Sequence, residues 1–170
     1  RSMQTVALID YGSGNLRSAE KALVKAADGR SEIVVTCDPQ VVAAADRIVL
    51  PGVGAFSACM TALSERPGLI EAMTDAARTQ GRPFLGICVG MQLLATRGLE
   101  FGETPGLDWI GGDVRRVTPS DPAAKIPHMG WNTLVSTHGP AMIAAIGDAP
   151  MYFTHSFAFY PDDDKDVAAW

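Results

Sequence analysis

A cysteine between two glycines carries the strongest chemical signal in the sequence. The segment Gly86-Ile87-Cys88-Val89-Gly90 has the form Gly-x-nucleophile-x-Gly, which is typical of a reactive side chain held on a tight turn between a strand and a helix. At the start of a helix, the dipole and the free amides favour a thiolate, and the amide of Val89 could stabilise an oxyanion. The pattern predicts that Cys88 attacks a carbonyl carbon. A buried structural cysteine between packing glycines is the alternative, and it is the interpretation we favour for Cys37 and Cys59.

A second pair of glycines follows the apolar run 47–50. The turn Pro51-Gly52-Val53-Gly54 is expected at the carboxyl end of a sheet, where open α/β sheets bind ligands. Glycines there let the backbone approach a ligand closely, and the amide near Val53 could supply a second oxyanion donor. Taken alone, the segment is better explained as a plain tight turn.

A cysteine nucleophile usually works with a histidine base, and the chain contains three histidines. His155 lies in the alternating segment 151–157, which predicts a strand, and it is either a base or a hydrogen-bonded wall residue. His138 lies in a Gly-Pro turn and is expected at the surface. His128 precedes a methionine and a tryptophan, which are enriched at partner surfaces, although a tryptophan in the core is as common.

The elements that position these residues follow from the apolar pattern. Short apolar runs at 6–9, 33–35, 47–50 and 84–87 predict strands, and helices are expected to begin at 16, 69 and 89, the last extending to about Thr96. Strands that are apolar on both sides need cover on both faces. After Glu100 the chain is rich in glycine, and strands are expected at 114–117 and 131–135. The predicted fold is therefore an α/β three-layer αβα sandwich with a mostly parallel central sheet plus added antiparallel strands.

Composition narrows the functional class. The chain has 170 residues, of which 47% are hydrophobic and 19% charged, as expected for a folded domain. The net charge of −5 argues against binding to nucleic acid or an anionic membrane. The sequence lacks zinc-ligand spacing, a phosphate-binding loop and the third glycine of a dinucleotide fingerprint, so we expect no metal and no cofactor. Three cysteines without disulfide-scaffold spacing favour a cytoplasmic location.

Four segments together resemble one family. They are the turn 51–54, the cysteine elbow, Pro127-His128-Met129-Gly130-Trp131-Asn132 and Tyr152-Phe153-Thr154-His155-Ser156, in that order. The sequence resembles the glutaminase subunits of imidazole glycerol phosphate synthases, which belong to the triad (class I) glutamine amidotransferases of histidine biosynthesis. The resemblance covers residues 6–161, and the segments 9–16 and 127–132 are specific to this subunit.

The resemblance implies a reaction and a partner. Cys88 would attack the side-chain amide of glutamine, release ammonia and form a glutamyl thioester that water hydrolyses to glutamate. Ammonia would pass to a cyclase subunit with a (β/α)₈ barrel, which makes imidazole glycerol phosphate, so the enzyme would be a heterodimer with hydrolase and lyase activities. The residues implied at the oxyanion and substrate site are Gly52, Val53, Gly54, Val89, Gln92, Glu100, His155 and Ser156, with Glu103 as the alternative to Glu100. The residues implied to face the cyclase are Pro127, His128, Met129, Gly130, Trp131, Asn132 and Tyr152.

One feature of the family is missing. Its catalytic base lies in a C-terminal His-Pro-Glu motif, which does not occur in a chain that ends at Trp170. We expect residues 1–170 to form a single glutamine amidotransferase domain that lacks its C-terminal part, and we do not assign the base to His155, which matches a binding position. Two alternatives stay open: another cysteine-elbow α/β hydrolase, which would not need the segment 127–132, and a non-catalytic scaffold that only binds a barrel partner.

Overall fold

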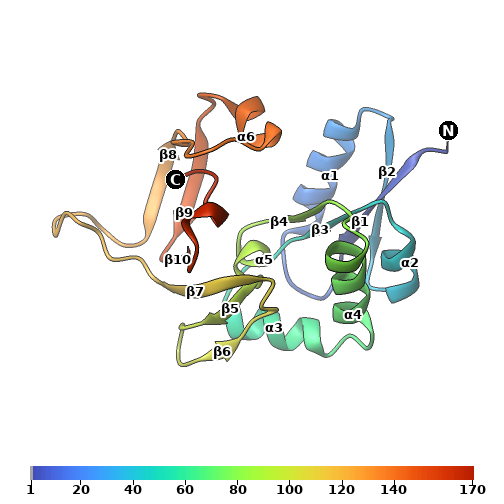
Figure 1. The fold of residues 1–170 in the computed structure, drawn as a ribbon, viewed down its shortest axis with the longest axis horizontal. Helices are drawn as coiled ribbons and strands as arrows, with labels where there is room; N and C mark the ends of the chain where they lie inside the picture. The colour runs from blue at the N-terminus through green and yellow to red at the C-terminus, as the bar shows by residue number, and fades with distance from the viewer. Residues whose placement is uncertain (1) are drawn as a thin grey trace. The chain divides into compact units, whose positions relative to one another are not determined.

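The computed structural model describes residues 2–170, which form two compact units, one ending at Leu94 and the other spanning Ala95–Trp170 (Figure 1). The first unit is built on a four-stranded parallel sheet with the order β2-β1-β3-β4. Its strands are β1 (Gln4–Ile9), β2 (Ser31–Thr36), β3 (Arg47–Leu50) and β4 (Phe84–Gly86). The four predicted strands and their parallel arrangement are confirmed.

Both faces of this sheet are buried. Helix α1 (Leu16–Ala27) packs Leu16, Ala19 and Leu23 against Val6, Leu8 and Val49. Side chains alternate between the faces of a strand, and the residues on the opposite face, Ala7, Ile9, Ile48 and Leu50, are also buried. Helices α2 (Pro39–Ala44) and α3 (Phe56–Ser64) each contact α4 (Leu69–Thr74), and all three bury apolar side chains. Helix α4 continues into the π-helical turn η1 (Asp75–Thr79). Burial of a leucine or isoleucine side chain contributes roughly 1.5–3 kcal/mol to the stability of the fold. Ile9 and Leu50, the last residues of β1 and β3, are fully buried, so these strand ends are held in the core.

The helix after the cysteine is shorter than the pattern predicted. Helix α5 spans only Val89–Gln92, and the chain enters strand β5 (Ala95–Gly98) before the expected end at Thr96. The apolar residues beyond Gln92 satisfy helical spacing, but pairing with a later strand decides their conformation: Ala95 is fully buried opposite Ile110. The prediction of a longer helix is wrong for this reason.

The second unit contains two small sheets. One has the order β10-β7-β5-β6, in which β5 and β7 (Ile110–Arg116) run parallel, while β6 (Thr104–Pro105) and β10 (Phe157–Pro161) are antiparallel to their neighbours. The other is the antiparallel pair of β8 (His128–Asn132) and β9 (Met151–His155), and the unit also holds α6 (Ala141–Ile146) and the 3₁₀ turn η2 (Asp164–Asp166). The expected antiparallel strands are confirmed. The strand predicted at 131–135 instead begins at His128 and ends at Asn132, and Val135 pairs with Trp170 by two backbone hydrogen bonds.

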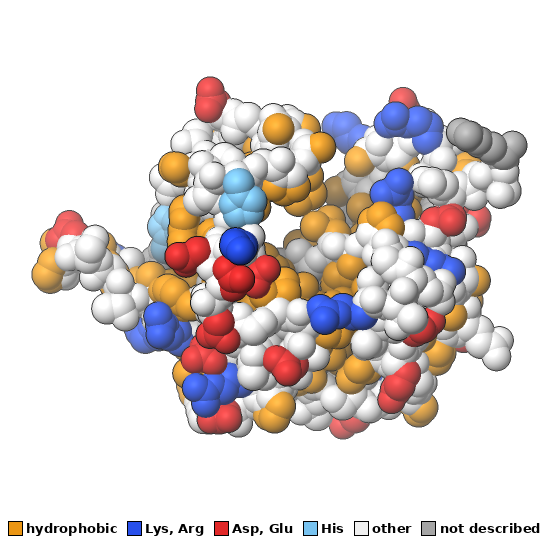
Figure 2. Space-filling model, in the orientation of Figure 1, with side chains coloured by type: hydrophobic (Ala, Val, Ile, Leu, Met, Phe, Trp, Pro, Cys, Tyr) orange, Lys and Arg blue, Asp and Glu red, His pale blue; other side chains and the backbone are white. Residues whose placement is uncertain are grey.

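Acidic and basic side chains are interspersed over the visible face of the molecule (Figure 2). Among residues 2–170, no helix is long and apolar enough to cross a membrane.

Candidate active site

The cysteine elbow has the geometry expected of a nucleophile. Strand β4 ends at Gly86 and α5 begins at Val89, which leaves Cys88 on the turn between them. The backbone of Cys88 has φ 56° and ψ −122°, a conformation that costs a non-glycine residue about 1–3 kcal/mol and persists only when the surroundings enforce it. Cys88 is exposed, and Cys59 is buried as expected. The expectation of a buried cysteine is wrong for Cys37, which is also exposed. The strained turn therefore presents the Cys88 thiol to solvent.

The flanking glycines are required by close backbone contacts. A Cβ atom on Gly86 would lie 2.5 Å from the Cα atom of Met91, and one on Gly90 would lie 2.0 Å from the carbonyl oxygen of Leu50. Both contacts involve backbone, which cannot rotate away as a side chain can. Any larger residue at either position would push α5 away from the sheet.

The turn 51–54 lies against the elbow, as the sequence predicted. The amide of Ile87 donates to the carbonyl of Leu50 at 2.9 Å, and a Cβ atom on Gly52 would lie 2.6 Å from the amide nitrogen of Gly90. Gly54 has φ 85°, which lets the chain reverse into helix α3. The carboxyl ends of β3 and β4 thus bring the nucleophile and the glycine turn together.

Both predicted oxyanion donors are engaged within the protein. The Val89 amide donates to the Gly52 carbonyl at 3.3 Å, and the Val53 amide donates to the Ser13 hydroxyl at 3.3 Å. The Gly52 carbonyl and the Val53 amide belong to one peptide unit. Rotation of this single peptide would release both hydrogen bonds, so one local movement controls both donors.

Three residues that sequence reasoning did not assign to the site hold this turn. The Tyr11 hydroxyl donates to the Pro51 carbonyl at 2.6 Å, and the carbonyl of Val53 accepts from the Ser13 hydroxyl at 3.0 Å and from the Cys59 thiol at 3.2 Å. Tyr11 is fully buried, and this burial raises its pKa above the ordinary value, so the phenol stays protonated and donates. The only signal for these roles was the match of the segment 9–16 to the family, which includes Tyr11 and Ser13 but not Cys59.

The remaining predicted substrate residues are divided between the two units. Gln92 ends α5 in the first unit, whereas Glu100, His155 and Ser156 lie in the second. The Glu103 carboxylate forms an ion pair with Arg97 at 3.0 Å, which engages one of its oxygens.

The residues predicted to face a partner lie on the β8–β9 ribbon, except Pro127, which directly precedes β8. Trp131 and Tyr152 are directly opposite each other, with ring centroids 5.3 Å apart in an edge-to-face contact. Trp131 is 68% exposed, Met129 60% and Tyr152 53%. Large exposed aromatic and methionine side chains grouped in this way are characteristic of protein interfaces.

A chain of hydrogen bonds crosses the same ribbon. The Nδ2 atom of Asn132 lies 2.8 Å from Nε2 of His128, and Nδ1 of His128 lies 2.9 Å from Nε2 of His155. The Nδ1 atom of His155 lies 2.9 Å from the carbonyl oxygen of Phe157. Both ring nitrogens of His155 are therefore hydrogen-bonded within the second unit, as the wall-histidine interpretation expects.

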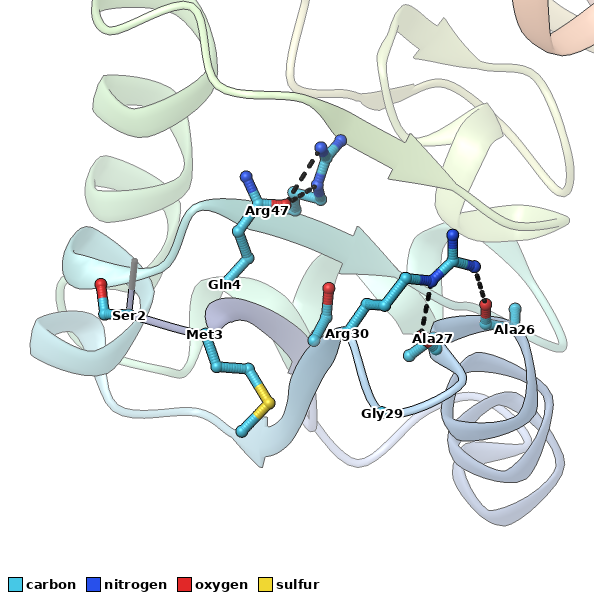
Figure 3. Close-up of a pocket in the computed structure, with 9 residues that line it drawn as sticks. Ser2, Met3, Gln4, Ala26, Ala27, Gly29, Arg30 and Arg47 are labelled. Atoms are coloured by element: carbon cyan, nitrogen blue, oxygen red, sulfur yellow. Dashed lines mark hydrogen bonds between the residues drawn. The ribbon is translucent and has the colours of Figure 1, made fainter.

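A cavity in the first unit lies away from the elbow. It has a volume of about 780 Å³ and is lined by residues at the start of β1, β2 and β3 and the end of α1 (Figure 3). Both guanidinium groups at this cavity are already hydrogen-bonded. Arg30 donates to the backbone carbonyls of Ala26 and Ala27. Arg47 donates to the side-chain oxygen of Gln4. Because the strands are parallel, this cavity is at the opposite end of the sheet from Cys88. Among residues 2–170, no group of three or more His, Cys, Asp or Glu side chains is arranged to hold a metal ion.

Comparison with known proteins agrees with this geometry. A model of the family described as class I glutamine amidotransferase matches residues 7–170, and the chain belongs to this family. Two solved structures share the fold. One is a glutamine amidotransferase, with a TM-score of 0.64 at 17% identity over 91% of this chain and 72% of that one. The other is described as a putative GMP synthase protein from Thermoplasma acidophilum, with a TM-score of 0.58 at 20% identity over 96% and 71%. The predicted α/β amidotransferase fold is confirmed.

Sequence relatives define the subgroup. The chain is 58% identical to the imidazole glycerol phosphate synthase subunit HisH of Caulobacter vibrioides, over 98% of this chain and 80% of the relative. It is 57% identical to the same subunit of Rhodospirillum rubrum, over 93% and 76%, and 50% identical to that of Zymomonas mobilis, over 99% and 78%. The predicted resemblance is confirmed, and the alternative of an unrelated elbow hydrolase is set aside. The names of these relatives describe subunits, which implies that they work with a partner chain.

Proposed function

We propose that the protein hydrolyses glutamine to glutamate and ammonia at Cys88 and passes the ammonia to a cyclase subunit that makes imidazole glycerol phosphate in histidine biosynthesis. The observation that carries the proposal is the exposed, strained Cys88 on its elbow, packed against the turn 51–54. The identity to HisH subunits supports the choice of substrate and pathway.

The proposed reaction has two stages. The Cys88 thiolate attacks the side-chain carbonyl carbon of glutamine, a carbon–sulfur bond forms, and the carbonyl oxygen takes the negative charge. Collapse of this tetrahedral species breaks the carbon–nitrogen bond, and the nitrogen leaves as ammonia after accepting a proton. Water then attacks the thioester, giving glutamate and the free thiol.

Stabilising the oxyanion requires a rearrangement of the turn. The amides of Val53 and Val89 are the proposed donors, and the loss of one such donor typically costs about 10²–10³ in rate. Because both amides are bonded internally, the peptide between Gly52 and Val53 must rotate before they can bind the substrate oxygen. The proposed enzyme is therefore slow until something, such as the partner, favours the rotated form.

The proposed substrate contacts are those that the family resemblance implies. Gln92, Glu100 and the backbone of His155 and Ser156 would hold the amino-acid end of glutamine, with the Glu100 carboxylate paired to its ammonium group. Gly52 and Gly54 would line the oxyanion side. We do not assign the general base to His155, because both nitrogens of its ring are already hydrogen-bonded. Proton transfer by such a base is worth about 10²–10⁴-fold.

The proposed partner is a barrel cyclase that binds the β8–β9 ribbon to form a heterodimer. The exposed Met129, Trp131 and Tyr152 supply the apolar part of this interface, and the rest of the segment 127–132 borders them. The three free cysteines favour the cytoplasm as its location.

The experiment compares two exposed cysteines in the full-length protein bound to its cyclase. Cys88→Ala should abolish glutamine hydrolysis. The control is Cys37→Ala, the same change at the other exposed cysteine, and it should leave hydrolysis intact. Glutamine turnover that survives Cys88→Ala would overturn the proposal. A complex that forms normally but never hydrolyses glutamine would instead identify a non-catalytic scaffold.

A further inference from the structure

We propose that His128 is a positioning residue for glutamine binding, which links the partner-facing strand β8 to the bend at Ser156. This inference rests on the proposed function, because that function assigns the backbone at His155 and Ser156 to the substrate. The role of His128 follows from the chain of hydrogen bonds from Asn132 to the Phe157 carbonyl.

The protons in this chain have one arrangement when both rings are neutral. A carbonyl oxygen can only accept, so Nδ1 of His155 carries the proton and Nε2 of His155 accepts. Nδ1 of His128 must then donate to His155, which leaves Nε2 of His128 to accept from the amide of Asn132. The Phe157 carbonyl thus fixes the tautomer of His155, and the hydrogen bond from His128 fixes the orientation of the His155 ring.

The His128 ring is also held by packing. It stacks on Phe153 with ring centroids 5.2 Å apart and an interplanar angle of 28°, and it meets His155 edge-on at 5.0 Å. The ring is partly buried and is restrained on a face and at both nitrogens. A side chain restrained in this way transmits a displacement of β8 to His155 instead of absorbing it by changing rotamer.

The far end of the hydrogen-bond chain is the backbone bend that joins the two sheets of the second unit. Strand β9 ends at His155 and β10 begins at Phe157, so Ser156 alone makes the bend. The Ser156 carbonyl accepts from the Val117 amide at 2.9 Å, and the His155 ring spans the bend to the Phe157 carbonyl. The ring chain therefore sets the path of the backbone to which we assign glutamine.

The near end of the hydrogen-bond chain lies on β8, the strand that carries the proposed partner surface. Side chains alternate between the faces of a strand, so His128 and Asn132 lie on the face opposite to Met129 and Trp131. Asn132 follows the exposed Trp131 on the same strand, and His128 precedes the exposed Met129. The β8–β9 backbone ladder already pairs the strands over 128–132, so the side-chain link is not needed for pairing. The side-chain link connects β8 to the Phe157 carbonyl through the two imidazole rings, in addition to the backbone ladder. A partner that displaces β8 would therefore also displace the bend that holds the substrate.

The test uses two substitutions of His128, each of which places an amide group near the position of one of the two ring nitrogens. In His128→Asn the amide nitrogen can replace Nδ1 and still donate to His155, whereas in His128→Gln the amide reaches the position of Nε2 and the donor to His155 is lost. In the full-length protein with its cyclase, His128→Gln should raise KM for glutamine about tenfold, the effect of one lost hydrogen bond, while kcat changes less than about twofold. His128→Asn should restore KM to within about threefold. His138→Gln, the same exchange at an exposed histidine, is the control and should change neither constant.

Equal KM values for His128→Gln and wild type would overturn the inference, as would equal losses in both His128 variants. A measurement that needs no turnover is the ¹⁵N spectrum of the imidazoles, in which both rings should carry their proton on Nδ1. Protonation of His128 on Nε2 alone would contradict the proposed chain even if every variant unfolds. A wild-type complex that does not hydrolyse glutamine would refute the proposed function, but the ¹⁵N result would still decide whether His128 orients His155.

Discussion

Replacing Gly90 by alanine tests whether the elbow and the turn 51–54 depend on direct backbone contact. The added Cβ atom would lie 2.0 Å from the carbonyl oxygen of Leu50, 2.8 Å from its carbonyl carbon and 2.9 Å from that of Pro51. Ordinary contacts between such atoms begin above about 3 Å, so strand β3 and helix α5 must separate by roughly 1 Å. The three atoms are all backbone, so no side chain can relieve the overlap.

The size of the effect follows from two opposing contributions. Overpacking of this kind costs about 1–3 kcal/mol and sometimes more, whereas alanine in a helix is favoured over glycine by about 1 kcal/mol. Because the overlap is severe, we expect Gly90→Ala to lower the free energy of unfolding by about 2–3 kcal/mol. For a chain of this length, that corresponds to a fall in Tm of about 4–12 °C.

Activity should fall further than stability suggests. A shift of about 1 Å at an active site can cost about 10²-fold in rate, so Gly90→Ala with its cyclase should show that loss in kcat at a temperature where it remains folded. Thermal unfolding and glutaminase assays provide the two measurements. Gly139→Ala is the matched control, because a Cβ atom there meets nothing within 4 Å and its φ is not in the left-handed region. A Gly90→Ala protein with wild-type stability and full activity would refute the packing argument.

Two further predictions concern the partner surface and the buried tyrosine. Trp131→Ala should weaken cyclase binding by at least about 2 kcal/mol without lowering Tm, as judged by calorimetric titration; Met142→Ala, which removes a similarly exposed side chain outside the ribbon, should leave binding unchanged. Tyr11→Phe should cost about 1–3 kcal/mol by leaving the buried Pro51 carbonyl unpaired, and urea denaturation that shows no loss would contradict this bond. Burial raises the pKa of Tyr11 above the ordinary value for a tyrosine, so the folded state favours the protonated phenol. Its contribution is therefore complete below about pH 10 and is lost at higher pH, a decline that Tyr11→Phe should remove from the pH–stability curve.

The first half of the fold could be predicted because its strands are apolar on both faces and lie between helices. The elbow could be predicted because its Gly-x-Cys-x-Gly pattern lies within five consecutive residues, although the backbone that requires Gly90 to be glycine is that of Leu50 and Pro51 on another strand end. The end of α5 could not be predicted, since Ala95 joins a strand through pairing with Ile110, which lies farther along the chain.

The parts of the site that sequence reasoning missed depend on how the chain folds around the carbonyl of Val53. Ser13 bonds to this carbonyl from 40 positions away, whereas Cys59, six positions along the chain, reaches it from helix α3. The match of the segment 9–16 to the family did not specify this hydrogen bond for Ser13, and no pattern around Cys59 indicated its role. The hydrogen bond between His128 and His155 could likewise not be predicted from the sequence, because it depends on the strand register that places the two residues opposite each other. The position of a hydrogen-bond partner in space, and not the residue type, carries this information.

The central claim is that Cys88 forms a covalent glutamyl thioester, and trapping this species tests it most directly. The full-length protein with its cyclase would be mixed with glutamine, quenched in acid within milliseconds, digested and analysed by mass spectrometry. We predict a glutamyl adduct on the peptide that contains Cys88 and none on the peptide that contains Cys37, the other exposed cysteine. Rapid glutamine hydrolysis with no adduct on Cys88, or with the adduct on Cys37, would contradict the account.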